Sequence, residues 1–332
     1  MSFRAIRVTR AADRGAPNRV ALVDLPNLAD PPAPGDALVE VEYSSLNFKD
    51  ALALTGRPGI VRVDELTAGI DLVGVVRASA SDGWQPGDRV TVNGYGLGET
   101  EPGGLAERTR IDGSWGIRVP ARMTSRQAAA IGTAGYTAAL CVDRLAQAGL
   151  GDGAEVVVTG AAGGVGTIAL LLGRAAGWRM TAVTGRPERA DGLRALGAAD
   201  ILDRAELSSP GKPLQSARWD GAIDAVGGDI LANVLAQTRP GGTVTACGNA
   251  ADARLSTTVM PFILRGVTLA GINSVEPPHA VRSAAWERLD RDLDLDALDA
   301  VTEEIALTDA IEAASRFFDG GVAGRLVVDV RR

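Results

Sequence analysis

The sequence predicts an α/β fold with two lobes, a small antiparallel β-barrel followed by a doubly wound parallel sheet. The chain has 332 residues, and single hydrophobic cores stop growing at about 250–300 residues. Short strand-like segments between turns fill roughly the first 120 residues, and strand-like and helix-like segments alternate from about residue 154. The first pattern is typical of a small barrel, and the second is typical of a parallel sheet covered by helices.

The first lobe is built from short segments that alternate apolar and polar residues or follow a Pro-Gly turn. From Ser125 the apolar period becomes helical, with a break between Gly132 and Gly135. The segment 324–330 is a further apolar strand, which we expect to return to this lobe. The other expected strands of the lobe are 37–43, 69–76, 84–92 and 103–111.

The second lobe alternates apolar strands with helices. Pro187 lies near the start of one helical run and Gly197 at its end, as is usual at helix boundaries. We therefore expect a first domain of residues 1–123, completed by 299–332, and a second domain of residues 124–298. The expected strands are 154–160, 179–185, 199–203, 219–227, 241–248 and 266–273, and the expected helices are 167–177, 187–197 and 229–239.

The composition excludes several classes of protein. A net charge of −7 argues against general binding to nucleic-acid phosphates. No apolar run reaches the roughly 18–20 residues of a membrane span, and the N-terminal segment lacks the apolar centre of a secretory signal. Cys141 and Cys247 are the only cysteines. We therefore expect no disulfide framework, no membrane partner, and a cytoplasmic location.

The supply of metal ligands is equally small. His279 is the only histidine, whereas a catalytic zinc site needs about three clustered Cys, His or carboxylate ligands. We expect no metal site. Ser-His-Asp catalysis would have to use His279, and no G-x-S-x-G elbow accompanies it.

A glycine-rich loop follows the first strand of the second lobe and opens a helix. Gly160, Gly163, Gly164 and Gly166 lie within it, and Thr167 can add a hydroxyl. Glycine allows a tight turn and a close approach of a pyrophosphate to the backbone, and the helix start directs its N–H groups at that phosphate. The alternative is a loop that only packs the helix on the strand. The strand–loop–helix–strand context favours a bound dinucleotide.

The end of the next strand distinguishes between two dinucleotides. An NAD site usually has an acidic residue about 20 residues beyond the glycine loop, but the strand here ends at Thr184, Gly185 and Arg186. The planar guanidinium of Arg186 matches a 2′-phosphate, while the alternative is an exposed surface arginine. Glu188 is expected in the first turn of the following helix. The sequence therefore favours NADPH over NADH.

Several motifs occur in the order typical of a known family. They include "SSLNFKDAL", "GIDLVGVV", "IGTAGYTA", "VVVTGAAGGVG", "VTGRPER" and "TTVMPFILRGV". Over nearly its whole length the chain resembles the zinc-independent medium-chain dehydrogenases/reductases, within them the group of acrylyl-CoA reductases (NADPH) and quinone oxidoreductases. The resemblance implies a GroES-like β-barrel catalytic domain, a Rossmann domain and a homodimer, with 266–274 pairing across a two-fold axis. It also implies hydride transfer from NADPH to the β-carbon of an α,β-unsaturated thioester.

The resemblance also implies functional residues. The catalytic ones are Asn47, Lys49 and Asp50. Taken alone, Cys247, Phe262 and Leu264 would be interpreted as core residues. The residues expected to bind the cofactor are Phe48, Thr133, Thr137, Gly160, Gly163, Gly164, Val165, Gly166, Thr167, Ile168, Thr184, Gly185, Arg186, Arg204, Cys247, Gly248, Phe262, Leu264, Asn273 and Arg325.

The chain departs from the group at Phe48, where the group usually has tyrosine. Phenylalanine cannot donate a proton, so the donor to the α-carbon is open and water is one candidate. The enolate oxygen must be stabilised, by a hydrogen bond from Asn47 or by the charge of Lys49. The alternative for Lys49 is a surface residue paired with Asp50.

Three functions remain open. The first is a reductase of a short acyl-CoA such as acrylyl-CoA, and the second is an NADPH:quinone or enone oxidoreductase. The third is a non-catalytic NADPH-binding sensor or scaffold, which only Phe48 suggests. A CoA ester needs cations for its phosphates, and the candidates are Arg57, Arg62, Arg282 and Arg288.

Overall fold

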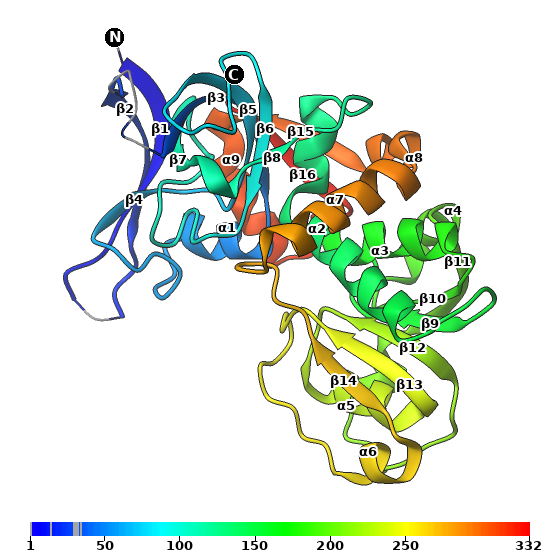
Figure 1. The fold of residues 1–332 in the computed structure, drawn as a ribbon. Coiled ribbons are helices and arrows are strands. Elements are labelled where there is room, and N and C mark those ends of the chain that lie inside the picture. Colours follow the sequence, from blue (N-terminus) through cyan, green and yellow to red (C-terminus); the bar gives the residue numbers. More distant parts are fainter. Residues whose placement is uncertain (1, 14, 29–32, 34) are drawn as a thin grey trace. The chain divides into compact units, whose positions relative to one another are not determined.

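The computed structural model describes residues 2–13, 15–28, 33 and 35–332. The chain divides into two compact units, which are described separately (Figure 1). The first division lies between Thr133 and Ala134, later than the 123/124 boundary expected from the sequence. Unit 1 comprises Met1–Thr133, Ser274–Ser283 and Leu298–Arg332, and unit 2 comprises Ala134–Asn273 and Ala284–Ala297.

Unit 1 is a mainly antiparallel β structure centred on one long strand. That strand, β3, pairs with β5, β7 and β16. A second sheet has the order β2-β1-β4, and an isolated bridge between Ala5 and Ala106 links it to the segment before β7. The strands of unit 1 are β1 (Ser2–Thr9), β2 (Arg19–Pro26), β3 (Asp36–Leu46), β4 (Glu65–Thr67), β5 (Asp71–Ser79), β6 (Arg89–Asn93), β7 (Arg108–Asp112), β8 (Ile117–Arg118), β15 (Thr302–Ala306) and β16 (Arg325–Asp329).

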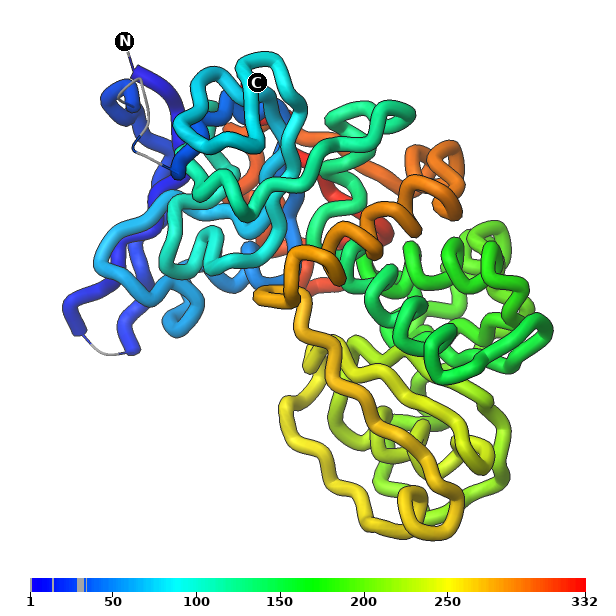
Figure 2. Tube along the Cα trace, viewed as in Figure 1, coloured from blue at the N-terminus to red at the C-terminus, as the bar shows by residue number. Residues whose placement is uncertain are grey.

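The four strands expected in the first lobe correspond to β3, β5, β6 and β7. The expected return of 324–330 is confirmed, because β16 pairs antiparallel with β3. In Figure 2 the C-terminus is marked among the blue and cyan segments of the first part of the chain. The sequence analysis did not anticipate β1 and β2, which pair over their full lengths. Buried apolar side chains of the strands of unit 1 form its core, among them Val39 and Val41 of β3 and Leu72 of β5.

The helices of unit 1 are short, and three helices cross from one unit to the other. The longest, α2, is broken at Gly132, whose φ of 47° and ψ of −159° are not helical. This confirms the break expected there. The helices within unit 1 are α1 (Phe48–Leu54) and α9 (Ala310–Ala313), and those that cross are α2 (Ser125–Gln147), α7 (His279–Asp292) and α8 (Leu295–Ala300).

Unit 2 contains a parallel sheet with the order β11-β10-β9-β12-β13-β14 among the described residues. In chain order this is 3-2-1-4-5-6, the order of the Rossmann fold. Val156, Val157 and Val158 of the central strand are fully buried, as expected for a sheet covered on both faces. The strands are β9 (Glu155–Val158), β10 (Arg179–Thr184), β11 (Ala198–Asp203), β12 (Trp219–Asp224), β13 (Thr238–Ala246) and β14 (Thr268–Gly271).

The helices of unit 2 follow the strands in the order that the sequence predicts. Gly177 and Gly197 end two of the predicted runs with positive φ values, of 76° and 113°. The helices are α3 (Gly164–Ala175), α4 (Ala190–Ala195), α5 (Gly228–Gln237) and α6 (Met260–Arg265). Throughout the part of the chain that the structure describes, each helix is too short or too polar to cross a bilayer.

Candidate active site

The glycine loop of unit 2 forms a bare backbone cradle at the start of α3. A Cβ atom on Gly166 would lie 2.5 Å from both the Gly160 carbonyl oxygen and the Ala161 Cα atom, so only glycine allows this packing. Gly163 is the N-cap residue and provides no side-chain cap. The first-turn N–H groups around Gly164 and Val165 therefore suit an anion.

The loop residues divide into an outer and an inner set. Gly163, Gly164 and Val165 reach the surface, whereas Thr167 and Ile168 are buried in α3. Thr167 is 1% exposed, and its backbone N–H donates to the Gly163 carbonyl. This burial gives no support to the expected contribution of the Thr167 hydroxyl, so that contact stays a prediction.

Asp224 ties together the ends of three strands beside the glycine loop. Its carboxylate accepts hydrogen bonds from the Thr159 hydroxyl at 2.6 Å and the Gly227 N–H at 2.9 Å. Its carbonyl accepts the Cys247 N–H at 2.8 Å. Burial raises the pKa of Asp224. The sequence analysis missed this residue, although a lone acid in the apolar run "GAIDAVG" was a signal.

Arginines gather where β10 and β11 end. The Thr184 hydroxyl accepts the Arg186 backbone N–H at 3.1 Å. A Cβ atom on Gly185 would lie 2.8 Å from the guanidinium carbon of Arg204. Burial lowers the pKa of Arg189 and the charge of Arg186 lowers it further, while the charge of Glu188 opposes the shift. We call Arg186, Arg189 and Arg204 the arginine cluster.

The arginine cluster fits a phosphate group. Among the described residues, no carboxylate forms an ion pair with Arg186 or Arg204, so their charge is not neutralised within the protein. Asp203, which directly precedes Arg204, instead accepts the Ala205 N–H at 2.8 Å. The structure therefore adds Arg189 to the residues that the sequence analysis selected.

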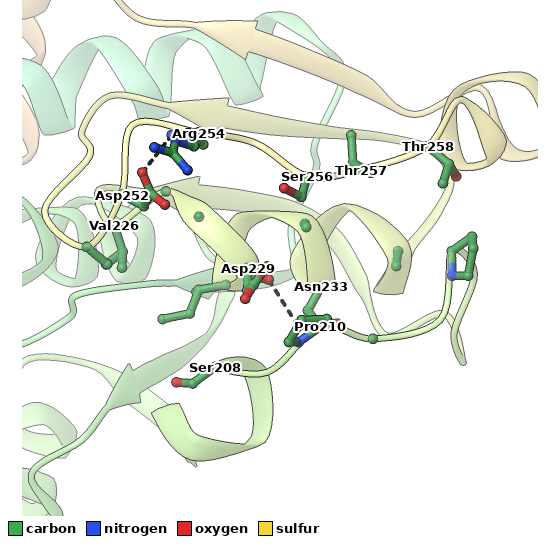
Figure 3. Close-up of a pocket in the computed structure, with 18 of the residues that line it drawn as sticks. Ser208, Pro210, Val226, Asp229, Asn233, Asp252, Arg254, Ser256, Thr257 and Thr258 are labelled. Carbon is green, nitrogen blue, oxygen red and sulfur yellow. Dashed lines mark hydrogen bonds between the residues drawn. The ribbon is translucent and has the colours of Figure 1, made fainter.

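A cavity of about 680 Å³ in unit 2 adjoins this cluster. It lies between the start of α5 and the segments 204–213 and 251–258 (Figure 3). Arg204 lines the cavity and also packs on Gly185, so the cavity and the arginine cluster share this residue. Ser208, Asp229 and Ser256 add polar groups to the wall.

The other predicted cofactor residues of unit 2 are scattered. Thr137 is buried in the second half of α2, and Phe262 packs against the Rossmann core. Leu264 is 59% exposed on α6, and Asn273 and Gly248 are exposed in loops. For Phe262 the structure shows the core environment that its residue type alone suggested.

Cys247 lies beside the other cysteine of the chain. The neighbouring thiol of Cys141, together with burial, raises the pKa of Cys247 well above its usual range. The Cys247 thiol also donates to the Asp224 carbonyl at 3.2 Å. Cys247 is therefore a neutral, hydrogen-bonded thiol.

In unit 1, Asn47 caps helix α1 with its side chain fully engaged. Its amide nitrogen donates to Asp50 Oδ2 at 3.1 Å and to Asp71 Oδ2 at 2.7 Å. Its amide oxygen accepts from Arg325 Nη1 at 3.3 Å. An amide has two N–H donors, and both are directed at carboxylates. This geometry favours a positioning role for Asn47 over the predicted hydrogen bond to an enolate.

Asp50 is a buried acid with an unusual pKa. Burial, followed by the charge of Asp71, raises its pKa to about 7, although hydrogen bonds from Asn47 and Ile70 oppose the shift. The Ile70 N–H donates to Asp50 Oδ1 at 2.9 Å. Asp50 and Asp71 are thus two carboxyl groups bridged by one amide.

Lys49 does not pair with Asp50, so that alternative is wrong. Its ammonium group lies 2.7 Å from Glu99 Oε1, and Arg62 binds the other oxygen of Glu99 at 3.1 Å. Neighbours on a helix point in different directions, so Lys49 reaches the loop after β6 while Asp50 turns inward. The sequence analysis did not select Glu99.

Phe48 lies beside a second aromatic side chain. It is 41% exposed, and its ring packs edge-to-face on Phe318 at 5.6 Å. The Arg57 guanidinium lies 4.0 Å from the centre of the Phe318 ring.

Two of the four arginines suggested as ligands of CoA phosphates are bound to other groups of the protein. Arg282 is 1% exposed and donates to the carbonyls of Asn93 and Val275. Arg288 is bound to Asp143 and Asp292. Arg57 is exposed, as is Arg62 beside Glu99.

The other predicted residues of unit 1 gather around Asp71. Both the backbone N–H and the hydroxyl of Thr133 donate to its carboxylate. Arg325 is buried and donates from Nη2 to the Ser45 hydroxyl at 3.0 Å. Asp71 itself was not predicted. The signal was an aspartate inside the apolar run "GIDLVGVV".

Within the described ranges, no group of three or more His, Cys, Asp or Glu residues could hold a metal ion. Cys141 and Cys247 lie in unit 2, and His279 is an exposed residue at the start of α7 in unit 1.

Unit 2 is a Rossmann sheet with a glycine cradle and an arginine cluster, and unit 1 is a β domain with a buried polar site. This combination defines the class of two-domain, dinucleotide-binding α/β proteins. Comparisons with known proteins place the chain more closely. Residues 33–145 match the alcohol dehydrogenase GroES-like domain, and residues 164–291 match the zinc-binding dehydrogenase domain. The chain belongs to the medium-chain dehydrogenase/reductase superfamily.

Individual relatives are similar over almost their whole length. Acrylyl-CoA reductase AcuI of Ruegeria pomeroyi is 42% identical over 99% of each chain. The structure of Escherichia coli K-12 YhdH with bound NADPH is 42% identical, with a TM-score of 0.91 over 98% of this chain and 99% of that one. Bacillus subtilis YhfP with NAD bound is 37% identical, with a TM-score of 0.91 over 99% and 100%. The expected GroES-like and Rossmann fold is thus confirmed.

Proposed function

We propose that this chain is an NADPH-dependent reductase that acts on the C=C bond of a short α,β-unsaturated acyl-CoA, with acrylyl-CoA as the model substrate. The observation that carries the proposal is the arginine cluster at the ends of β10 and β11, close in sequence to a glycine cradle. The similarity to acrylyl-CoA reductase AcuI supports the choice of substrate. The product would be propionyl-CoA.

The residues of unit 2 suit the pyrophosphate and the 2′-phosphate of NADPH. The N–H groups at Gly163, Gly164 and Val165 would hold the pyrophosphate. Thr184, Arg186 and Arg204 would hold the 2′-phosphate through a hydroxyl and two guanidinium groups. The cavity lined by Arg204 would take the adenosine end. NADPH, when bound, supplies the hydride for the β-carbon.

The residues of unit 1 suit the acyl group. Reduction at the β-carbon places negative charge on the thioester oxygen, which needs a preorganised donor or cation. The amide hydrogens of Asn47 are engaged with Asp50 and Asp71, so Lys49 is the better candidate. Its ammonium group keeps donors beyond the one directed at Glu99. Because Phe48 has no hydroxyl, water would supply the proton to the α-carbon.

Metal content, oligomeric state and location of the enzyme can be proposed from the same residues. We propose that it is zinc-independent, because the described residues offer no cluster of metal ligands. We propose a homodimer because β14 is the last strand of its sheet and the neighbouring α6 exposes Ile263 and Leu264. A cytoplasmic location agrees with two free cysteines in contact.

The decisive experiment follows the oxidation of NADPH by absorbance, with acrylyl-CoA and then with a simple quinone, and repeats both with NADH. Rapid oxidation of NADPH by acrylyl-CoA, with the quinone at least tenfold slower in kcat/KM, is the expected result. If the quinone reacts faster than acrylyl-CoA, the substrate assignment is wrong. If NADH serves as well as NADPH, the assignment of the arginine cluster is wrong.

A quinone or enone oxidoreductase is the second candidate function. The observation in its favour is the similarity to the quinone oxidoreductase YhfP, which is 40% identical over 88% of this chain. The non-catalytic alternative rests on Phe48 alone. Tight binding of NADPH without turnover of either substrate would favour it, and Phe48→Tyr would then be the variant to assay.

A further inference from the structure

We propose that Asp71 is a positioning residue for the proposed reduction, because its buried carboxylate fixes Asn47 and Thr133 in one arrangement. This inference rests on the proposed function. Asp71 is 1% exposed and lies at the start of β5. The residues that it holds come from two distant segments, the start of α1 and the break in α2.

The carboxylate of Asp71 is saturated with donors. Oδ1 accepts from the Asn93 amide at 2.7 Å, the Thr133 hydroxyl at 2.6 Å and the Thr133 N–H at 2.9 Å. Oδ2 accepts from the Ser45 hydroxyl and the Asn47 amide, both at 2.7 Å. A carboxylate has about four acceptor sites, so the two oxygens are fully used.

The register of the sheet brings these groups together. Tyr43 of β3 pairs with Val73 of β5, so Ser45 comes opposite Asp71 further along the antiparallel ladder. Asp71 pairs directly with Asn93 of β6. Leu326 of β16 pairs with Leu46, which places Arg325 beside Asn47. Two strand pairings thus meet at the carboxylate, and the third places Arg325 against Asn47 and Ser45, which bind the carboxylate.

The break in α2 brings the last partner. Gly132 has a backbone conformation open essentially only to glycine, and the break turns the Thr133 N–H toward Asp71. A Cβ atom on Gly132 would lie 2.6 Å from Asp71 Oδ2 and 2.6 Å from Ser45 Oγ. Any side chain at position 132 would therefore collide with the carboxylate of Asp71 and with Ser45 in the observed backbone conformation.

These contacts determine what the two held residues can offer. The Thr133 hydroxyl hydrogen is directed at Asp71, so in any further hydrogen bond the hydroxyl oxygen acts as the acceptor. The amide of Asn47 is locked by Asp50, Asp71 and Arg325. This fixes the start of α1, which carries Phe48 and Lys49. Asp71 acts on the chemistry through these neighbours and not by contact with substrate.

The test compares Asp71→Asn with Val76→Ala, which removes two methyl groups from the buried part of the same strand. The amide of the variant would present N–H donors to groups that are themselves donors. We expect kcat for acrylyl-CoA, per NADPH-binding site titrated, to fall about 100-fold, because small displacements of reacting groups have effects of that size. KM and the Kd for NADPH should change less than about threefold. Val76→Ala should keep kcat within twofold.

Ser45→Ala is the milder second variant, because it removes one donor to Asp71. We expect a fall in kcat of roughly three- to tenfold, by the modest weight of one hydrogen bond. Exchange of the backbone N–H hydrogens of Thr133 and Asn47 should be faster than in the wild type in both variants. It should be unchanged in Val76→Ala. If Asp71→Asn matches Val76→Ala in kcat and in exchange, the positioning role is disproved.

Failure of the proposed function gives a different pattern. Wild-type protein that turns over neither acrylyl-CoA nor a quinone contradicts the function, and the exchange rates then decide the role of Asp71. Unchanged exchange in Asp71→Asn would refute the inference, and accelerated exchange at both amides would support it.

Discussion

At the scale of single residues, the proposed specificity for NADPH rests on Arg186 and Arg204, which form no ion pair among the described residues. Arg186 follows β10, and the tip of that strand carries Thr184 in place of an acid. Burial and the charge of Arg186 lower the pKa of Arg189, so the like charges repel in the absence of an anion. A phosphate would relieve this repulsion, and a ribose hydroxyl would not.

We predict that Arg186→Ala raises the KM for NADPH about 10- to 100-fold and leaves the KM for NADH within twofold. Hydrogen bonds to charged groups contribute roughly 1.5–3 kcal/mol, which corresponds to this range. Arg194→Ala is the matched control, because Arg194 is an exposed arginine of α4 that pairs with Asp191. Steady-state kinetics with both cofactors measure the effect. An equal rise in both KM values would contradict the 2′-phosphate contact.

At the scale of elements, the edge of the Rossmann sheet is the notable feature. β14 pairs with β13 and is the last strand of the sheet (Figure 1). Beside it, Ile263 is 68% exposed and Leu264 59% exposed. A bare strand edge beside apolar side chains is a site where a second chain can add its own strand. An exposed position of Leu264 also agrees better with a subunit contact than with the predicted cofactor contact.

We predict that Ile263→Asp converts a dimer into a monomer, because an unpaired carboxylate is costly to bury in an interface. Val281→Asp is the control, since Val281 is an exposed apolar residue of α7, in unit 1. Sedimentation velocity at micromolar concentration measures the oligomeric state. A wild-type protein that sediments as a monomer would refute the homodimer, and an Ile263→Asp variant that stays dimeric would place the contact elsewhere.

At the scale of the whole molecule, stability should depend on pH through the buried acids. The pKa of Asp50 is about 7 in the fold, whereas the ordinary pKa of an aspartate is 3.8. The folded protein therefore holds a proton that the unfolded chain releases. The stability from this group is full below about pH 4, falls as pH rises toward 7, and does not fall further above that. Asp224, whose pKa is also raised, acts in the same direction.

We predict that Asp50→Asn flattens this dependence. In wild type the group alone lowers the free energy of unfolding by about 1.4 kcal/mol per pH unit between roughly pH 4 and 7. The variant should lose that slope, whatever its stability at a single pH. Thermal unfolding at pH 5, 6, 7 and 8 measures the difference, with the exposed Asp191→Asn as control. Parallel curves for Asp50→Asn and wild type would show that Asp50 is ionised throughout.

Features whose evidence is local could be predicted from the amino-acid sequence. The apolar runs and glycines of 154–186 predicted the strands, the helix and the phosphate cradle, because each depends on residues next to one another in the chain. The missing acid after β10 likewise follows from a few adjacent residues. The fold class and the family followed from the order of such local motifs.

The contacts between side chains that are distant in sequence could not be predicted and were seen first in the three-dimensional fold. Asp71 binds residues from β3, β6, α1 and the break in α2, and Lys49 binds Glu99 rather than the adjacent Asp50. Arg325 reaches Ser45 across 280 positions of sequence, and Arg282 is buried where an exposed phosphate ligand was expected. Strand register and the bend at Gly132 set these contacts, and neither leaves a periodic signal in the sequence. The local chemistry could therefore be predicted, while its assembly around one buried carboxylate could not.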